Sequence, residues 1–219
     1  MDFLSFTRAT EQFVYELMTW VLFFPLTIVK IILNPLNAVD YVDVEDSKPQ
    51  DTAYASAMRP ALLLLIAITI GSMAVPFTPE QIASLSKLRI GRIITDSWVN
   101  LVLFRLITFS TFPTIAALLF DRFTPGKIDR FSLRTPFSQQ CYLISPFVLF
   151  VSRALAHSLS QQIDWVTVTI IVSHLWLIFA ETLFFVKRAN FSWLTGVAAS
   201  LFVVSFGWIF VFVAFYLLS

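Results

Sequence analysis

Residues 193–218, WLTGVAASLFVVSFGWIFVFVAFYLL, decide the fold, because they run for several helical turns without one charged residue. A helix that crosses the hydrocarbon core of a bilayer needs about 20 mainly apolar residues. The rest of the chain has the same character: 58% of its 219 residues are hydrophobic, 24 are Phe, and the mean hydropathy is +0.79. A water-soluble domain cannot bury that much apolar surface. The composition therefore predicts a single integral membrane domain, an all-α polytopic bundle over residues 1–219.

Five stretches of the chain have the length and composition of membrane-spanning helices. Each is bounded by charged or proline-containing turns, and Trp98, Trp165 and Trp193 open three of them, as aromatic anchors at a membrane interface do. The backbone must be helical there, because an open strand would leave its polar groups unpaired in lipid. The predicted spans are Pro60–Phe77, Trp98–Phe120, Cys141–Leu159, Trp165–Val186 and Trp193–Leu218, within a five-span bundle over residues 60–219.

The first segment, Phe3–Leu33, has a different pattern from these spans. Its polar residues recur mostly every three or four positions, so they form a stripe along one face of a helix. They are Ser5, Arg8, Gln12, Glu16, Thr19, Thr27, Lys30 and Asn34. A polar stripe of that length favours an amphipathic helix over residues 1–34 that lies in the membrane interface. The alternative is a sixth span whose stripe faces a partner.

The distribution of basic residues predicts the orientation. With an interfacial first helix, one side of the membrane carries ten basic residues and the other carries three, and the basic side of a membrane protein is cytoplasmic. The ten are Arg8, Lys30, Lys48, Arg59, Arg122, Lys127, Arg130, Arg134, Lys187 and Arg188, and the three are Lys87, Arg89 and Arg92. We expect a cytoplasmic N-terminus, an outer C-terminus and, as the membrane, a bacterial inner membrane.

Two connections on the expected cytoplasmic side are strongly charged. The segment 35–59, expected to be an acidic loop, contains Asp40, Asp43, Glu45 and Asp46, which form a candidate docking site for a partner. Carboxylates at such spacing could also hold a divalent cation, although no EF-hand spacing is present. The segment 121–138 carries Arg122, Lys127, Arg130 and Arg134, which are candidates for contact with anionic lipid headgroups.

Ionisable side chains at membrane depth are candidates for function by default. Three of them are candidates for a structural or transport role: Arg105, His174 and Glu181. His174 and Glu181 lie seven residues apart and therefore share a helix face. One interpretation is a proton or ion relay through these two residues with Arg105 as counter-ion. The other, which we favour, is structural: a buried ion pair or hydrogen bonds that hold helix against helix.

The motifs of soluble and intramembrane enzymes do not occur in the sequence. There is no Gly-x-Ser-x-Gly, no His-Glu-x-x-His, no pair of membrane aspartates and no phosphate-binding glycine loop. Two histidines and one distant cysteine, Cys141, make no metal site. We therefore expect neither an enzyme nor a cofactor or metal, and no nucleic-acid partner.

Several segments together resemble the Yip family of small five-span membrane proteins. The segment Asn34-Pro35-Leu36-Asn37-Ala38-Val39 is similar to the proline-containing amphipathic entry of bacterial members, and Met58-Arg59-Pro60-Ala61-Leu62-Leu63 to their entry into the first span. Cys141-Tyr142-Leu143-Ile144-Ser145-Pro146 resembles the Tyr-to-Pro motif that opens the third span. The Asp-Leu-x-Gly-Pro signature of eukaryotic members is absent, so the resemblance does not extend to Rab-GTPase binding. It implies five spans, a cytoplasmic N-terminus and a membrane organiser or accessory protein.

The sequence thus leads to two functional hypotheses. The first is a non-catalytic integral membrane protein, an organiser or accessory subunit that acts by helix packing with itself or within a larger membrane complex. The second is a small ion or solute transporter or channel with His174 and Glu181 in its path. Under either hypothesis, the expected partners of the protein are the lipid bilayer and other membrane-protein subunits or further copies of the chain.

Overall fold

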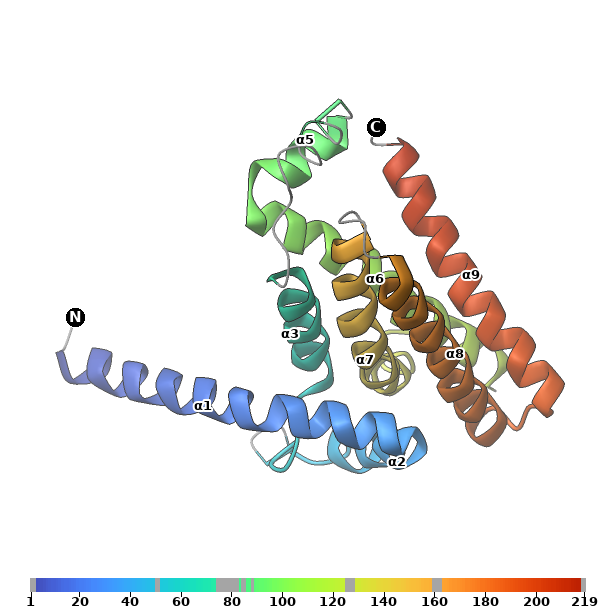
Figure 1. Cartoon of the computed structure of the whole chain (residues 1–219). Helices are drawn as coiled ribbons and strands as arrows, with labels where there is room; N and C mark the ends of the chain where they lie inside the picture. The colour runs from blue at the N-terminus through green and yellow to red at the C-terminus, as the bar shows by residue number, and fades with distance from the viewer. Residues whose placement is uncertain are drawn as a thin grey trace.

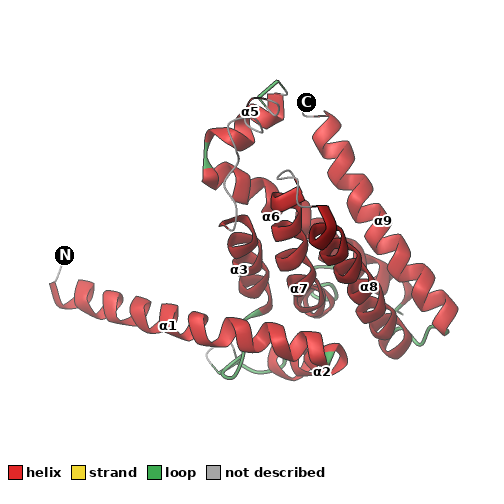
Figure 2. Cartoon of the chain, viewed as in Figure 1, coloured by secondary structure: helices red, strands yellow, loops and turns green. Residues whose placement is uncertain are grey.

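The computed structural model describes residues 3–49, 52–73, 83, 86, 87, 89–124, 129–158 and 163–217. Over these residues the chain is helical, without a strand, as Figure 2 shows. The eight helices described are α1 (Phe3–Leu33), α2 (Pro35–Asp46), α3 (Pro60–Met73), α5 (Arg89–Asp96), α6 (Trp98–Phe123), α7 (Arg134–Ser158), α8 (Ile163–Arg188) and α9 (Trp193–Leu217). The prediction of an all-α fold is confirmed.

Helices α3, α6, α7, α8 and α9 form a bundle, and α1 and α2 lie across one end of it (Figure 1). The opposite end carries α5 and the C-terminus. Helix α7 is the central element, because it packs against α3, α6 and α8 and also contacts α1 and α2. The N-terminal half of α1 extends away from the bundle. Helix α1 contacts the rest of the protein through its C-terminal turns, where Thr27, Ile28 and Ile31 are buried.

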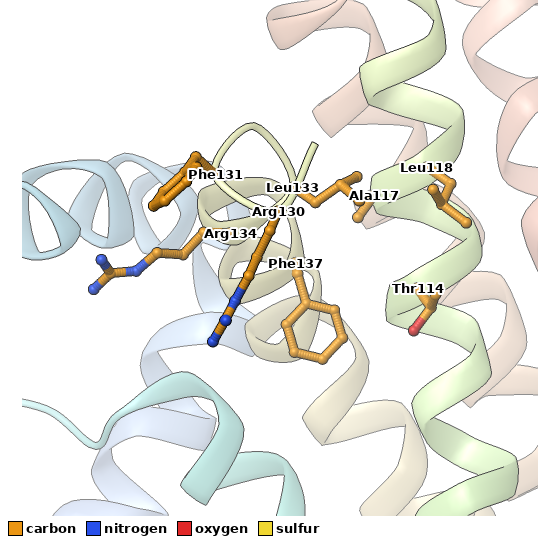
Figure 3. A pocket seen from close by; sticks show the side chains of 8 residues that line it. All are labelled: Thr114, Ala117, Leu118, Arg130, Phe131, Leu133, Arg134 and Phe137. Carbon is orange, nitrogen blue, oxygen red and sulfur yellow. The ribbon is translucent and has the colours of Figure 1, made fainter. Parts of the chain in front are cut away.

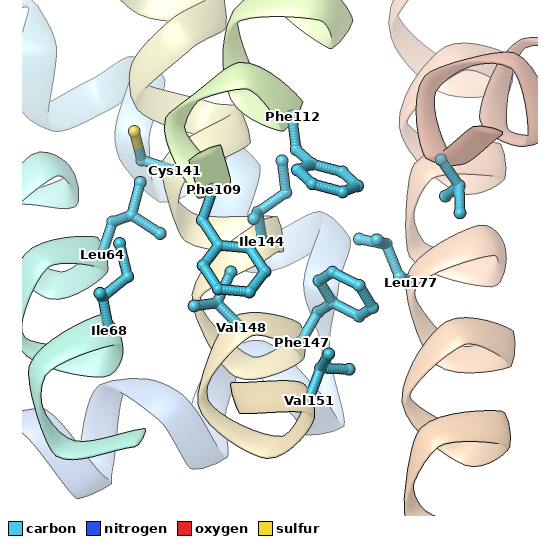
Figure 4. Close-up of a cluster of buried hydrophobic side chains, with 11 residues drawn as sticks. Leu64, Ile68, Phe109, Phe112, Cys141, Ile144, Phe147, Val148, Val151 and Leu177 are labelled. Carbon is cyan, nitrogen blue, oxygen red and sulfur yellow. The ribbon is translucent and has the colours of Figure 1, made fainter. Parts of the chain in front are cut away.

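The largest buried cluster lies where α7 meets its neighbours (Figure 4). It joins apolar side chains of α3, α6, α7, α8 and α9: Leu64, Ile68, Phe109, Phe112, Cys141, Ile144, Phe147, Val148, Val151, Leu177 and Val204. Close helix approach supports it, since a Cβ on Gly71 of α3 would lie 2.8 Å from the Cβ of Ser152 on α7. Small residues allow such contact between helices in a membrane.

Among the described residues, three helices are long and apolar enough to cross a membrane, instead of the five we predicted. They cover Trp98–Phe123, Trp165–Arg188 and Trp193–Ala214, and they are consistent with an integral membrane protein. Of the predicted first span, the described helix α3 covers the 14 residues Pro60–Met73, about 21 Å of helix against a hydrocarbon core of about 30 Å. The last residues of that span, 74–77, lie outside the described part.

The predicted third span, Cys141–Leu159, lies in helix α7 as far as Ser158, and α7 is not one of the three candidate spans found among the described residues. Helix α7 begins at Arg134, seven residues before the predicted start at Cys141. The added turn is polar, and buried polar side chains recur along the helix: Gln139, Gln140, Ser145 and Ser152. Because α7 is surrounded by other helices, these side chains meet protein and can be paired there.

The segment 35–59 is not wholly the loop that we expected, because its first half is helix α2. Asn34 caps this helix by accepting a hydrogen bond from the backbone amide of Asn37, and Pro35 occupies its first turn. Proline is favoured there because its missing N–H would be unpaired anyway. By contrast, the helix predicted for Phe3–Leu33 is confirmed by α1 with the same bounds.

Candidate functional site

His174 of α8 is held by hydrogen bonds at both ring nitrogens. The indole Nε1 of Trp208 on α9 donates to its Nε2 over 2.9 Å, and its Nδ1 lies 2.7 Å from the carbonyl oxygen of Ile170. An indole N–H can only donate. Nε2 is therefore the acceptor, and Nδ1 carries the proton that is donated to Ile170. The ring ties α8 to α9 through the bond from Trp208.

Glu181 lies about two helical turns after His174 on α8 and is fully buried. The side-chain amide of Gln140 on α7 donates to its Oε2 over 3.2 Å. The other carboxyl oxygen, Oε1, and the amide oxygen of Gln140 are both buried without a hydrogen-bond partner. No cation forms an ion pair with Glu181 among the described residues. This is a contact between α7 and α8 in which two acceptors lack a donor.

Arg105 does not meet Glu181, so the predicted relay with Arg105 as counter-ion is not assembled. Its Nη1 donates instead to Ser72 Oγ of α3 over 3.0 Å. The reason is position along the bundle. Arg105 lies in the first turns of α6, near the end of the bundle that carries α5, whereas Glu181 lies in the last turns of α8, toward the end that carries α2. His174 and Glu181 are themselves about 10 Å apart along their helix.

Two of the four predicted docking residues are engaged within the chain. Asp40 of α2 accepts from Lys187 Nζ over 2.9 Å and from Arg188 Nη2 over 2.7 Å, at the C-terminus of α8. Asp43 pairs with Arg188 and also accepts from the side-chain amide of Gln139 on α7. We call these five residues the clasp. It fixes α2 across α7 and α8.

The other two acidic residues, Glu45 and Asp46, hold the segment that follows α2. Glu45 is buried and accepts from Lys48 Nζ over 2.6 Å and from the backbone amide of Tyr54 over 2.5 Å. The hydroxyl of Tyr54 donates to Asp46 over 2.7 Å. Tyr54 has a φ of 62°, a backbone conformation that is costly for a bulky residue and persists only when its surroundings hold it. These bonds supply that support.

The pKa values of this cluster follow from the same contacts. Burial alone would raise the pKa of Glu45, but the hydrogen bonds from Lys48 and from the Tyr54 amide outweigh it, so the pKa lies below its ordinary value of 4.5. Burial, followed by the hydrogen bond to Asp46, raises the pKa of Tyr54. Glu45 is thus a structural carboxylate. Among the described residues, no group of three or more His, Cys, Asp or Glu could hold a metal ion.

The basic residues proposed for headgroup contact lie at the junction of α6 and α7. Three of them are exposed: Arg122 in the last turn of α6, Arg130 in the turn before α7, and Arg134 at the first residue of α7. Lys127 lies outside the described residues. Arg130 and Arg134 line a groove of about 1020 Å³ beside α6, which the sequence did not indicate.

Sequence reasoning missed the partners of the buried polar groups, namely Gln139, Gln140 and Trp208. Gln139 and Gln140 carry a usable signal, because two amides directly before a predicted span lie at the membrane boundary, where they need hydrogen-bond partners. Trp208 carries none, since a tryptophan in an apolar helix is ordinary.

Comparison with family models, curated proteins and solved structures finds no match to this chain. The function must therefore be inferred from the fold and from the contacts described above.

Proposed function

We propose that this chain is a non-catalytic integral membrane protein that acts by helix packing, as a membrane organiser or as an accessory subunit of a membrane complex. The observation that carries the proposal is the use of its interior polar groups. His174, Glu181 and Arg105 each bind a side chain of a different helix, and each such contact joins two helices. Polar groups used in this way hold a bundle together.

The outer surface of the bundle supports an assembly role. Helix α9 leaves much of its length uncovered, and its exposed side chains are large and apolar: Leu194, Phe202, Phe206, Ile209, Phe212 and Tyr216. Such a face suits lipid, a second copy of the chain or another membrane subunit. The proposed Yip-like character, a small membrane organiser without catalysis, agrees with these features.

We further propose that α3 and α7 are embedded in the membrane together with the three candidate spans. Helix α7 lies inside the bundle and is covered by neighbours on several sides, so its glutamines and serines need not face lipid. Helix α3 packs along α7. Five embedded helices place the ten basic residues on one side, which gives a cytoplasmic N-terminus and an outer C-terminus.

The alternative function, a transporter or channel through His174 and Glu181, requires both side chains to face water. His174 has both nitrogens occupied, and Glu181 is buried against Gln140. Proton and cation flux into liposomes that contain the purified protein separates the two proposals. We expect flux equal to that of protein-free liposomes. Flux above that level that is lost in Glu181→Gln would overturn the packing proposal in favour of transport.

A further inference from the structure

A groove opens at the end of α6 that the positive-inside rule makes cytoplasmic, between α6 and the turn that leads into α7 (Figure 3). Its walls are mostly apolar: Ala117 and Leu118 come from α6, and Leu133 and Phe137 from the start of α7. Thr114 extends the wall one turn further into the candidate span. The groove therefore begins at the end of a span and continues along it at membrane depth.

Two arginines also line this apolar groove. In Figure 3, Arg130 extends beside Phe137, on the side of that ring away from α6, and Arg134 extends from the same turn further away from α6. Neither guanidinium forms an ion pair with the described part of the chain. Positive charge beside apolar walls matches a molecule with an anionic head and an apolar tail.

The turn that carries the arginines is fixed in place. Asp129 Oδ1 accepts from the backbone amides of Phe131 and Ser132 over 2.8 and 2.9 Å. Ser132 Oγ donates to Asp121 Oδ2 of α6 over 3.0 Å, which ties the turn to the end of that helix. Arg130 is thus presented on a held backbone, at a set distance from the apolar wall.

We propose that this groove binds one anionic phospholipid, with its phosphate on Arg130, Arg134 adding charge nearby, and an acyl chain against Ala117, Leu118 and Phe137. Guanidinium groups bind phosphate through charge-assisted hydrogen bonds. Such a site binds one lipid molecule, which is a more specific interaction than the general attraction of a basic loop for a membrane. The proposal does not depend on whether the chain assembles with partners.

The test is native mass spectrometry of the full-length protein taken from nanodiscs of equal phosphatidylglycerol and phosphatidylcholine with the same acyl chains. We expect one retained phosphatidylglycerol per chain. Arg130→Ala should lower its retention about fivefold, the effect of one arginine near an anionic surface. Thr114→Phe, at an exposed position in the wall, should lower it by obstructing the tail. Arg122→Ala, which removes an equal charge outside the groove, is the matched control.

Three results would overturn the proposal: equal retention of the two lipids, unchanged retention in Arg130→Ala and Thr114→Phe, or an equal loss in Arg122→Ala. Inorganic phosphate separates a lipid site from a phosphate site. Millimolar phosphate should leave phosphatidylglycerol bound, and its displacement would contradict a site that holds the tail. The flux assay tests the proposed function separately, so none of these results changes what it shows.

Discussion

The buried polar side chains of this bundle take their partners from neighbouring helices. The sequence was sufficient to single out His174 and Glu181, because ionisable groups in apolar helices stand out. It could not supply Trp208 or Gln140, since each lies on another helix and the pairing depends on how the helices pack. Arg105 as counter-ion to Glu181, part of the interpretation that we did not favour, does not agree with the structure, since Arg105 binds Ser72. The sequence could not show this, because depth in a bundle is set by tertiary structure.

Glu181→Gln tests the structural role of this residue. A glutamine brings an amide donor that a carboxylate lacks, and the amide oxygen of Gln140 is a buried acceptor without a donor. We expect Glu181→Gln to keep or raise the thermal unfolding midpoint in detergent. Glu181→Leu leaves Gln140 unpaired and should lower the free energy of unfolding by about 1–3 kcal/mol. An equal loss in both variants would contradict this pairing.

At the scale of the elements, the start of several helices could be read from the sequence. Pro60, Trp98 and Trp193 open α3, α6 and α9 as predicted. Helix α2 was missed, because its four carboxylates resemble a solvated loop until the basic end of α8 is placed beside them. The length of α7 was missed because hydropathy identifies helices that face lipid, and this one faces protein.

The segment after α2 should lose stability in acid. The pKa of Glu45 is lowered in the folded protein, so its carboxylate contributes stability that is fully present above the ordinary value of 4.5 and is lost as the pH falls through the lowered value. We expect the unfolding midpoint of the wild type to exceed that of Glu45→Gln at pH 7, and the gap to narrow below pH 4.5. A difference in unfolding midpoint that stays constant from pH 7 to acid would show that the charge of Glu45 does not contribute to stability.

The whole molecule combines a charged end, formed by α2 and the clasp, with an apolar bundle. The membrane class that the composition predicts is consistent with the three candidate spans found among the described residues. The packing of the helices was not predictable, since apolar helices of similar composition can be arranged in many ways, and here a few polar contacts choose among them.

The orientation can be measured with a membrane-impermeant thiol reagent, because Cys141 is buried. We expect Lys87→Cys to react in intact cells, and Lys48→Cys and Asp2→Cys to react only after the membrane is opened. Reaction of Asp2→Cys from the side opposite to Lys48→Cys would make α1 a sixth span and contradict its place in the interface.

The proposed role in assembly is tested most directly by the mass and composition of the particle extracted in a mild detergent, measured by native mass spectrometry. We predict a particle with a fixed ratio of chains, either several copies of this chain or this chain with other membrane subunits. A particle that contains a single copy and nothing but lipid would contradict the proposal that this protein acts by packing against partners.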